Sequence, residues 1–279
     1  MAWFTSTLRY LAGLALLAVL VPIFAVLCVL LLPWRATRIR LCNIFGHIVG
    51  RSVVAITGAR LDATPFAGLG ADGPAIYVSN HTSALDIFLG IWIAPMGTCG
   101  VAKKEVVYYP LFGQLYAISG HLRLDRKNRE SAIEALRGTA EEVRRHRLGI
   151  WMWPEGTRAR DGRLQPFKKG FVHMAIATGL PIVPVLVTGA HRVWRKNDYR
   201  INGGEVAVRV LPAIPTTGWR AETTDEHVAQ VWRAMNEALR RSIGRCGKRP
   251  RPRSRSRSRH FPTTVCRMLA GHCGTTLTL

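Results

Sequence analysis

The run Ile182-Val-Pro-Val-Leu-Val187 gives the clearest indication of architecture in this sequence. All six residues are apolar, and no polar side chain alternates with them. A strand with this composition has both of its faces covered, as in sheets that carry helices on two sides. The run therefore predicts an α/β domain.

Strand and helix patterns alternate on both sides of this run. The other predicted strands are 75–78, 99–102, 122–124, 150–153 and 206–211, and the predicted helices are 83–92, 110–119, 129–145, 170–178 and 224–243. Such alternation is typical of parallel strands connected by crossover helices. We expect a mostly parallel or mixed sheet flanked by helices.

The beginning of the chain has a different character. Residues 11–32 carry no charge and are rich in Leu, Ala and Val, and a helix of this length would extend about 33 Å, enough to cross a bilayer core. Pro22 would allow a kink, so a re-entrant segment within one leaflet fits the pattern as well. The run is longer than a usual signal-peptide core and has no clear cleavage site, so we expect it to be retained.

Basic residues predict the orientation of this segment. Four arginines between residues 35 and 51 follow the apolar run, whereas only Arg9 precedes it. Because positive charge stays on the cytoplasmic side, the following domain should face the cytoplasm at the cell membrane. Apolar residues recur at helical spacing from Ile39 to Ile56, which fits either an interfacial helix or a core helix of the domain.

The net charge of the 279-residue chain is +22, and its distribution is uneven. Residues 245–279 contain nine basic residues, no acidic one and the repeat Arg253-Ser-Arg-Ser-Arg-Ser-Arg259. This composition predicts a disordered tail. The chain thus divides into membrane-inserted or interfacial helices (1–57), a globular domain (58–244) and a basic tail (245–279). The surplus of positive charge favours an anionic partner, such as lipid headgroups, phosphorylated ligands or nucleic acid.

A histidine and an aspartate follow the predicted strand 75–78. His81 lies three residues after Val78, and Asp86 lies five residues further on, at the start of a predicted helix. A histidine held by a carboxylate is suited to accept a proton from a hydroxyl near neutral pH. The spacing alone is weak evidence, so the pair carries weight only together with its neighbours.

A polar turn follows the predicted strand 150–153. Within Pro154-Glu-Gly-Thr-Arg158, Thr157 offers a hydroxyl and Arg158 a bidentate contact to phosphate. Other basic side chains follow or flank strands and helices, namely Lys103, Lys104, Arg123, Arg126, Lys168 and Lys169. In a parallel sheet they would gather at one edge and form a positive pocket beside His81.

Four ordered segments resemble the blocks of the glycerolipid acyltransferase family, in particular its lysophosphatidate acyltransferases. They are Asn80-His81-(four residues)-Asp86, Gly120-His-Leu-Arg-Leu-Asp-Arg126, Pro154-Glu-Gly-Thr-Arg158 and Leu180-Pro-Ile-Val-Pro-Val185. The resemblance covers roughly residues 60–215, which would make the globular domain an acyltransferase domain. Trp153 departs from the family, where Phe, Leu or Ile more often stands before Pro-Glu-Gly.

The resemblance implies roles for individual residues. His81 would be the base that activates the acceptor hydroxyl, and Asp86 would orient its imidazole. The acceptor's phosphate would be bound by Lys103, Lys104, Arg126, Glu155, Gly156, Thr157 and Arg158. Pro184 would shape the acyl or thioester region. The resemblance implies direct acyl transfer with no metal and no cofactor, and acyl-CoA or acyl carrier protein as co-substrate.

Several alternatives remain open at this point. Lysophosphatidic acid, converted to phosphatidic acid, is the acceptor that the resemblance favours, but glycerol-3-phosphate or a lyso-aminolipid would also fit. A serine hydrolase would need a Gly-x-Ser-x-Gly turn, which the sequence lacks. The Arg-Ser repeats and the high charge would also suit a membrane-anchored nucleic-acid-binding protein. Because no aromatic residues are interleaved with these repeats and the body has no recognition module, we expect no nucleic-acid partner.

Overall fold

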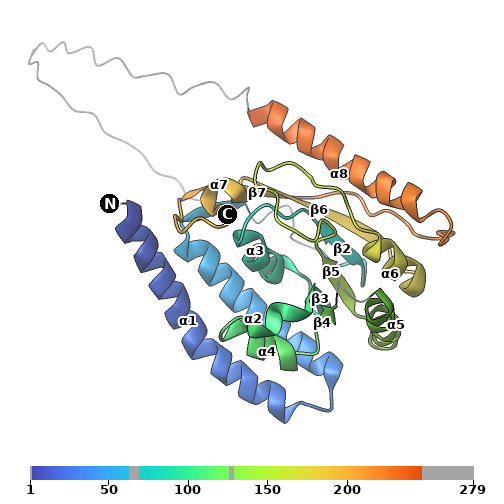
Figure 1. Cartoon of the computed structure of the whole chain (residues 1–279), viewed down its shortest axis with the longest axis horizontal. Coiled ribbons are helices and arrows are strands. Elements are labelled where there is room, and N and C mark those ends of the chain that lie inside the picture. Colours follow the sequence, from blue (N-terminus) through green and yellow to red (C-terminus); the bar gives the residue numbers. More distant parts are fainter. Residues whose placement is uncertain (1, 63–68, 126–128, 247–279) are drawn as a thin grey trace, which may run out of the picture.

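The computed structural model describes residues 2–62, 69–125 and 129–246. Figure 1 shows one sheet with helices on both of its faces. Its strands are β1 (Ala59–Asp62), β2 (Ile76–Ser79), β3 (Thr98–Lys103), β4 (Leu122–Leu124), β5 (Gly149–Met152), β6 (Ile182–Thr188) and β7 (Gly204–Val210). The helices are α1 (Ala2–Leu30), α2 (Arg35–Ile56), α3 (Leu85–Ile93), the 3-10 helix η2 (Lys104–Tyr108), α4 (Phe112–Ile118), α5 (Arg129–His146), α6 (Gly170–Thr178), α7 (Ala190–Val193) and α8 (Thr224–Cys246).

The sheet is mixed and mostly parallel, which confirms the predicted fold class. Its strand order is β1-β7-β6-β2-β5-β3-β4, and the five strands from β6 to β4 are parallel. Strand β7 is antiparallel to β6, and β1, which the sequence pattern does not predict, pairs with β7 in parallel. Because the five parallel strands end at the same edge, the loops that follow them share that edge.

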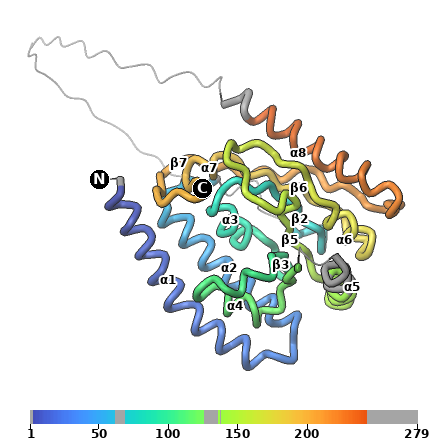
Figure 2. Tube along the Cα trace, viewed as in Figure 1, coloured from blue at the N-terminus to red at the C-terminus, as the bar shows by residue number. Residues whose placement is uncertain are grey.

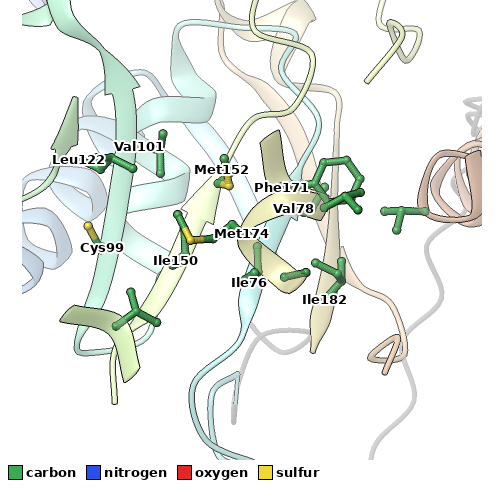
Figure 3. Close-up of a cluster of buried hydrophobic side chains, with 14 of the residues drawn as sticks. Ile76, Val78, Cys99, Val101, Leu122, Ile150, Met152, Phe171, Met174 and Ile182 are labelled. Atoms are coloured by element: carbon green, nitrogen blue, oxygen red, sulfur yellow. The ribbon is translucent and has the colours of Figure 1, made fainter. Parts of the chain in front are cut away.

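One face of the sheet packs against α5, α6 and α8. Figure 3 shows Ile76 and Val78 of β2 beside Ile150 and Met152 of β5, with Phe171 of α6 close to Val78. All five side chains are buried. Burial of their apolar area stabilises the fold and fixes the position of β2, from which His81 follows.

The opposite face packs against α3. Tyr77 of β2 and Trp151 of β5 point to this side, and their rings stack with centroids 5.8 Å apart. Leu85 and Leu89 of α3 cover them. Both faces of the central strands are therefore buried, which explains why their sequences are continuously apolar.

The first two helices form an antiparallel pair along the flank of the domain (Figure 2). Phe24 of α1 and Phe45 of α2 lie in contact, with ring centroids 5.2 Å apart. Polar side chains join α2 to the domain, because Asn43 donates to the Thr98 carbonyl oxygen at 3.0 Å and His47 lies 2.8 Å from the Ala94 carbonyl oxygen. Most of α2 is thus packed as a helix of the domain.

The outer face of α1 is apolar and exposed. The exposed side chains include Trp3, Phe4, Leu8, Leu11, Leu14, Val19, Ile23, Val26, Val29 and Leu30. By length and composition, Trp3–Leu30 and Arg35–Ile56 could each cross a membrane. A long exposed apolar face is typical of a surface that contacts lipid. The helix begins nine residues before the predicted span of 11–32.

Candidate active site

His81 and Asp86 lie together at the carboxyl end of β2. The Nδ1 atom of His81 is 3.2 Å from Oδ2 of Asp86, and the Asp86 side chain has no exposed surface. The same oxygen accepts hydrogen bonds from the backbone N–H groups of Thr82 (2.5 Å) and Ser83 (2.7 Å). The loop is therefore folded around the carboxylate, which holds the imidazole in one orientation.

Asn80 fixes the backbone immediately before His81. The last backbone pair between β2 and β6 joins Ser79 to Val185. Beyond this pair, the side-chain amide of Asn80 makes the two hydrogen bonds that a neighbouring strand's backbone would make. Its Nδ2 donates to the Val187 carbonyl oxygen at 2.8 Å, and its Oδ1 accepts from the Val187 N–H at 2.7 Å. The position of His81 is thus tied to β6 as well as to β2.

Glu155 joins the turn after β5 to the His81 loop. Its Oε1 accepts from the backbone N–H of His81 at 2.9 Å, and its Oε2 accepts from the N–H of Gln165 at 3.3 Å. Burial raises the pKa of the Glu155 carboxyl to about 7, and these two hydrogen bonds act in the opposite direction. The His81 carbonyl oxygen accepts from the N–H of Ala159 at 2.8 Å, which makes a second connection between the two segments.

The turn at residues 153–158 lies against the His81 loop. The ring of Trp153 faces the imidazole, with centroids 5.2 Å apart. Gly156 has φ +69°, a left-handed conformation that favours glycine and lets the chain reverse. Thr157 is exposed and Arg158 is half-buried. The predicted convergence of the 154–158 turn with the His81 loop is therefore present.

Lys196 is a polar neighbour of this turn that the sequence pattern does not indicate. Its Nζ donates to Thr157 Oγ1 at 3.2 Å and to the Arg158 carbonyl oxygen at 3.3 Å. Lys196 belongs to the loop of residues 194–203, which connects α7 to β7 (the 194–203 loop). The only signal in the sequence is that this loop follows β6, whose carboxyl end lies at the same edge as that of β2.

His191 is a second neighbour that the sequence pattern does not indicate. Its ring lies where a Cβ at Gly162 would meet it, at 2.7 Å from the imidazole Cε1. Burial, followed by the nearby guanidinium of Arg192, lowers the pKa of His191, while the Asp86 carboxylate has a weaker opposite effect. His191 thus lies on the α7 side of the site, where its surroundings disfavour the charged imidazolium.

The other predicted site residues do not join the His81 loop and the 154–158 turn in the described contacts. Lys103 and Lys104 are exposed at the end of β3, where Lys104 pairs with Asp125 at 2.5 Å and Lys103 lies 5.6 Å from the Tyr109 ring centroid. Pro184 is a buried residue of β6, directly paired with Val78 of β2. Arg126 lies outside the described residues. In the described ranges, no group of three or more His, Cys, Asp and Glu side chains is arranged to hold a metal ion.

Comparison with known sequences gives a consistent result. A family model for acyltransferases matches residues 59–188. A 1-acyl-sn-glycerol-3-phosphate acyltransferase from Limnanthes douglasii is 46% identical over 211 residues, which are 75% of this chain and 73% of the relative. A protein of the same name from Escherichia coli (strain K12) is 35% identical over 196 residues, 70% of this chain and 78% of the relative.

A solved structure has a similar fold. The crystal structure of the 1-acyl-sn-glycerophosphate (LPA) acyltransferase PlsC from Thermotoga maritima aligns with a TM-score of 0.69 over 90% of this chain and 100% of that protein. The two sequences are 21% identical, so this likeness concerns the fold alone. It extends over the helices as well as the sheet.

Proposed function

This chain belongs to the acyltransferase family, and from that membership we propose that it transfers a fatty acyl group from an acyl thioester to the sn-2 hydroxyl of lysophosphatidic acid, giving phosphatidic acid. The chain is an enzyme that resembles the 1-acyl-sn-glycerol-3-phosphate acyltransferases over most of its length. The observation that carries the proposal is the contact of His81 with Asp86, beside the 154–158 turn. The relatives and the family model all name acyltransferases, so nothing favours a nucleic-acid-binding protein.

In the proposed mechanism, His81 is the general base. The Nδ1–H group donates to Asp86, which leaves Nε2 free to take the proton of the acceptor's sn-2 hydroxyl. The hydroxyl oxygen then attacks the thioester carbonyl carbon, the C–S bond breaks, and the imidazolium returns its proton to the departing thiolate. The acyl group passes directly to the acceptor without an acyl-enzyme, and these steps need no metal and no cofactor.

The acceptor's phosphate is proposed to bind at the 154–158 turn. Arg158 supplies charge and Thr157 a hydroxyl, while the left-handed φ of Gly156 lets the chain reverse just before these two residues. Lys103, Lys104 and Arg126 are further contacts in this proposal. Glu155 contributes by holding the His81 backbone and the turn in place, because its carboxyl oxygens are occupied by backbone N–H groups.

The donor is proposed to be acyl-CoA or acyl carrier protein. Both are anionic, and exposed Lys103 and Lys104 lie at the same sheet edge as His81. Pro184 remains our candidate for shaping the acyl or thioester region, since it is buried beside Val78, the strand residue three positions before His81.

The protein associates with membranes through its N-terminal helices, and we propose that α1 lies in one leaflet with the acyltransferase domain at the cytoplasmic surface. Ser6 accepts from the Ile201 N–H at 3.1 Å, and Arg9 donates to the Ile201 carbonyl oxygen at 2.7 Å. Further along α1, Phe24 packs on α2. The helix is about 43 Å long and contacts the same domain near both of its ends. If it crossed the bilayer, one of these contacts would have to form on the far side of the membrane, away from the domain. The arginines that follow α1 favour the cytoplasmic side.

The three-part organisation is also part of the proposal. Helix α8 continues to Cys246, two residues beyond the predicted boundary, and residues 247–279 lie outside the described ranges. We expect a chain that ends at residue 246 to retain acyl transfer in detergent micelles. Complete loss of activity would show that residues 247–279 are part of the acyltransferase domain.

The direct test is an acceptor panel. The purified full-length chain, in neutral detergent micelles, is given acyl-CoA or acyl carrier protein thioester with lysophosphatidic acid, glycerol-3-phosphate or a lyso-aminolipid. We expect thiol release and phosphatidic acid, identified by mass spectrometry, with lysophosphatidic acid. Thiol release with only one of the other acceptors would overturn the proposed acceptor.

A further inference from the structure

We propose that Lys196 is a phosphate-binding residue of the acceptor site, acting together with Thr157 and Arg158. This inference rests on the proposed function, because it names a contact to the acceptor's phosphate. Lys196 is 39 residues away from Thr157 in sequence, outside the four family blocks. Its place at the turn is a result of the tertiary fold.

The ammonium group of Lys196 leaves one donor available. It has three N–H groups, of which two go to Thr157 Oγ1 and the Arg158 carbonyl oxygen. Both acceptors are neutral. Among the residues that the structure describes, no carboxylate lies within 4.0 Å of Lys196, whereas Lys104 and Lys169 pair with Asp125 and Asp225. A half-buried cation whose two partners in the described residues are neutral oxygens of the 154–158 turn is suited to an anionic ligand.

The contact also directs the hydroxyl of Thr157. A threonine hydroxyl has one hydrogen to donate and two lone pairs to accept with. Because Lys196 donates to one lone pair, the hydroxyl hydrogen points away from the ammonium. Thr157 is exposed, so this hydrogen can be donated to a phosphate oxygen. Lys196 therefore contributes charge and also sets the direction of a neutral donor.

The 194–203 loop holds Lys196 in place. Trp194 and Ile201 form an antiparallel bridge that closes the loop. On the side of the active site, Ser83 donates to the Trp194 carbonyl oxygen at 2.5 Å, and the Trp194 ring stacks on Phe88 of α3 with an interplanar angle of 4°. On the other side, Arg9 of α1 donates to Ile201. A lysine on such a supported loop loses little freedom on binding a ligand.

The test compares two neighbouring substitutions that remove the same charge. Lys196→Gln removes the proposed contact, and Arg195→Gln is the matched control, because Arg195 is an exposed cation one residue away. KM for lysophosphatidic acid, KM for the acyl thioester, kcat and the melting temperature are measured in neutral detergent micelles. Lys196→Arg serves as the conservative variant.

We expect Lys196→Gln to raise KM for lysophosphatidic acid about 10- to 100-fold, as for the loss of a charge-assisted hydrogen bond, with little change in thioester KM or melting temperature. Arg195→Gln should change KM less than about threefold, and Lys196→Arg should recover part of the affinity. Equal effects of both Gln variants would overturn the inference, and so would a loss of kcat and stability without a change in acceptor KM. Failure of the unsubstituted enzyme to use lysophosphatidic acid would instead refute the proposed function.

Discussion

The side-chain amide of Asn80 pairs with both backbone groups of Val187, at 2.8 Å and 2.7 Å, and so extends the contact between β2 and β6 by one residue pair. Both residues are buried, and His81 follows directly. The orientation of the proposed base therefore depends on an amide that has no part in the chemistry.

Replacing Asn80 should reduce activity without changing any group that touches substrate. Asn80→Ala leaves the Val187 N–H and carbonyl unpaired, which we expect to cost about 1–3 kcal/mol of stability and to lower kcat at least tenfold. Denaturant unfolding and thiol-release kinetics measure the two effects. Asn202→Ala, at an exposed asparagine, is the control. Full activity in Asn80→Ala would show that His81 is positioned without it.

Removal of His81 and removal of Asp86 should have different effects on stability. His81→Ala should lower kcat by about 10²- to 10⁴-fold with a nearly unchanged melting temperature. Asp86→Ala should lower both, because the N–H groups of Thr82 and Ser83 lose their buried acceptor. His173→Ala, at an exposed histidine of α6, should leave both quantities unchanged. Retained activity in His81→Ala would refute the proposed mechanism.

Glu155 should make stability depend on pH. Its pKa is raised from 4.5 to about 7 in the folded protein, so its contribution is fully present below about pH 4.5 and is lost as pH rises to about 7. The expected loss is on the order of 3 kcal/mol. The free energy of unfolding is measured from pH 4.5 to 8 for the unsubstituted chain and for Glu155→Gln. It should fall with rising pH in the unsubstituted chain and should lack this slope in Glu155→Gln.

A surface variant provides the control for this pH dependence. Glu222 is exposed, so Glu222→Gln should keep the slope of the unsubstituted chain. The same slope in Glu155→Gln would mean that another group titrates.

The outer face of α1 should determine membrane binding. Leu14 and Val19 are 54% and 62% exposed, and lysine at both positions should weaken binding to vesicles more than about 100-fold, because each change removes an apolar contact and adds a charge to it. Flotation with vesicles measures the binding of this double variant. Its acyl transfer in detergent micelles should be retained. Ala213→Lys, an exposed residue of the domain, is the control. Unchanged flotation of the double variant would exclude this face as the lipid contact.

The sequence predicts the parts of the fold where burial dictates composition. Residues 182–187 of β6 are continuously apolar because α6 and α8 cover the face that carries Leu186, while α3 covers the face that carries Val187. The sequence pattern does not indicate strand β1, because Ala59-Arg-Leu-Asp62 is short and its apolar residues alternate with charged ones at the sheet edge. It pairs with β7, about 145 positions away, and a pairing over this distance cannot be predicted from a local sequence pattern.

The sequence predicts those contacts of the site that join residues close together in the chain. His81 and Asp86 are five residues apart and their contact is local, so spacing predicts it. The contacts of Lys196 with Thr157 and of Ser83 with Trp194 join segments distant in sequence, and they depend on the position of β2 between β5 and β6. The apolar pattern does not indicate the first turns of α1, because Ser6 and Arg9 interrupt it, although both side chains bond to the backbone of Ile201.

The attachment of α1 to Ile201 and to α2 has a consequence for how the enzyme meets its lipid. In the arrangement that we propose, with α1 in one leaflet, these contacts connect the helix to the catalytic domain, so the depth of α1 in the leaflet also sets the height of His81 above the acyl chains. Tighter headgroup packing would lift both together. The rate on a bilayer should then vary with lipid packing even where the chemistry of the acceptor stays the same.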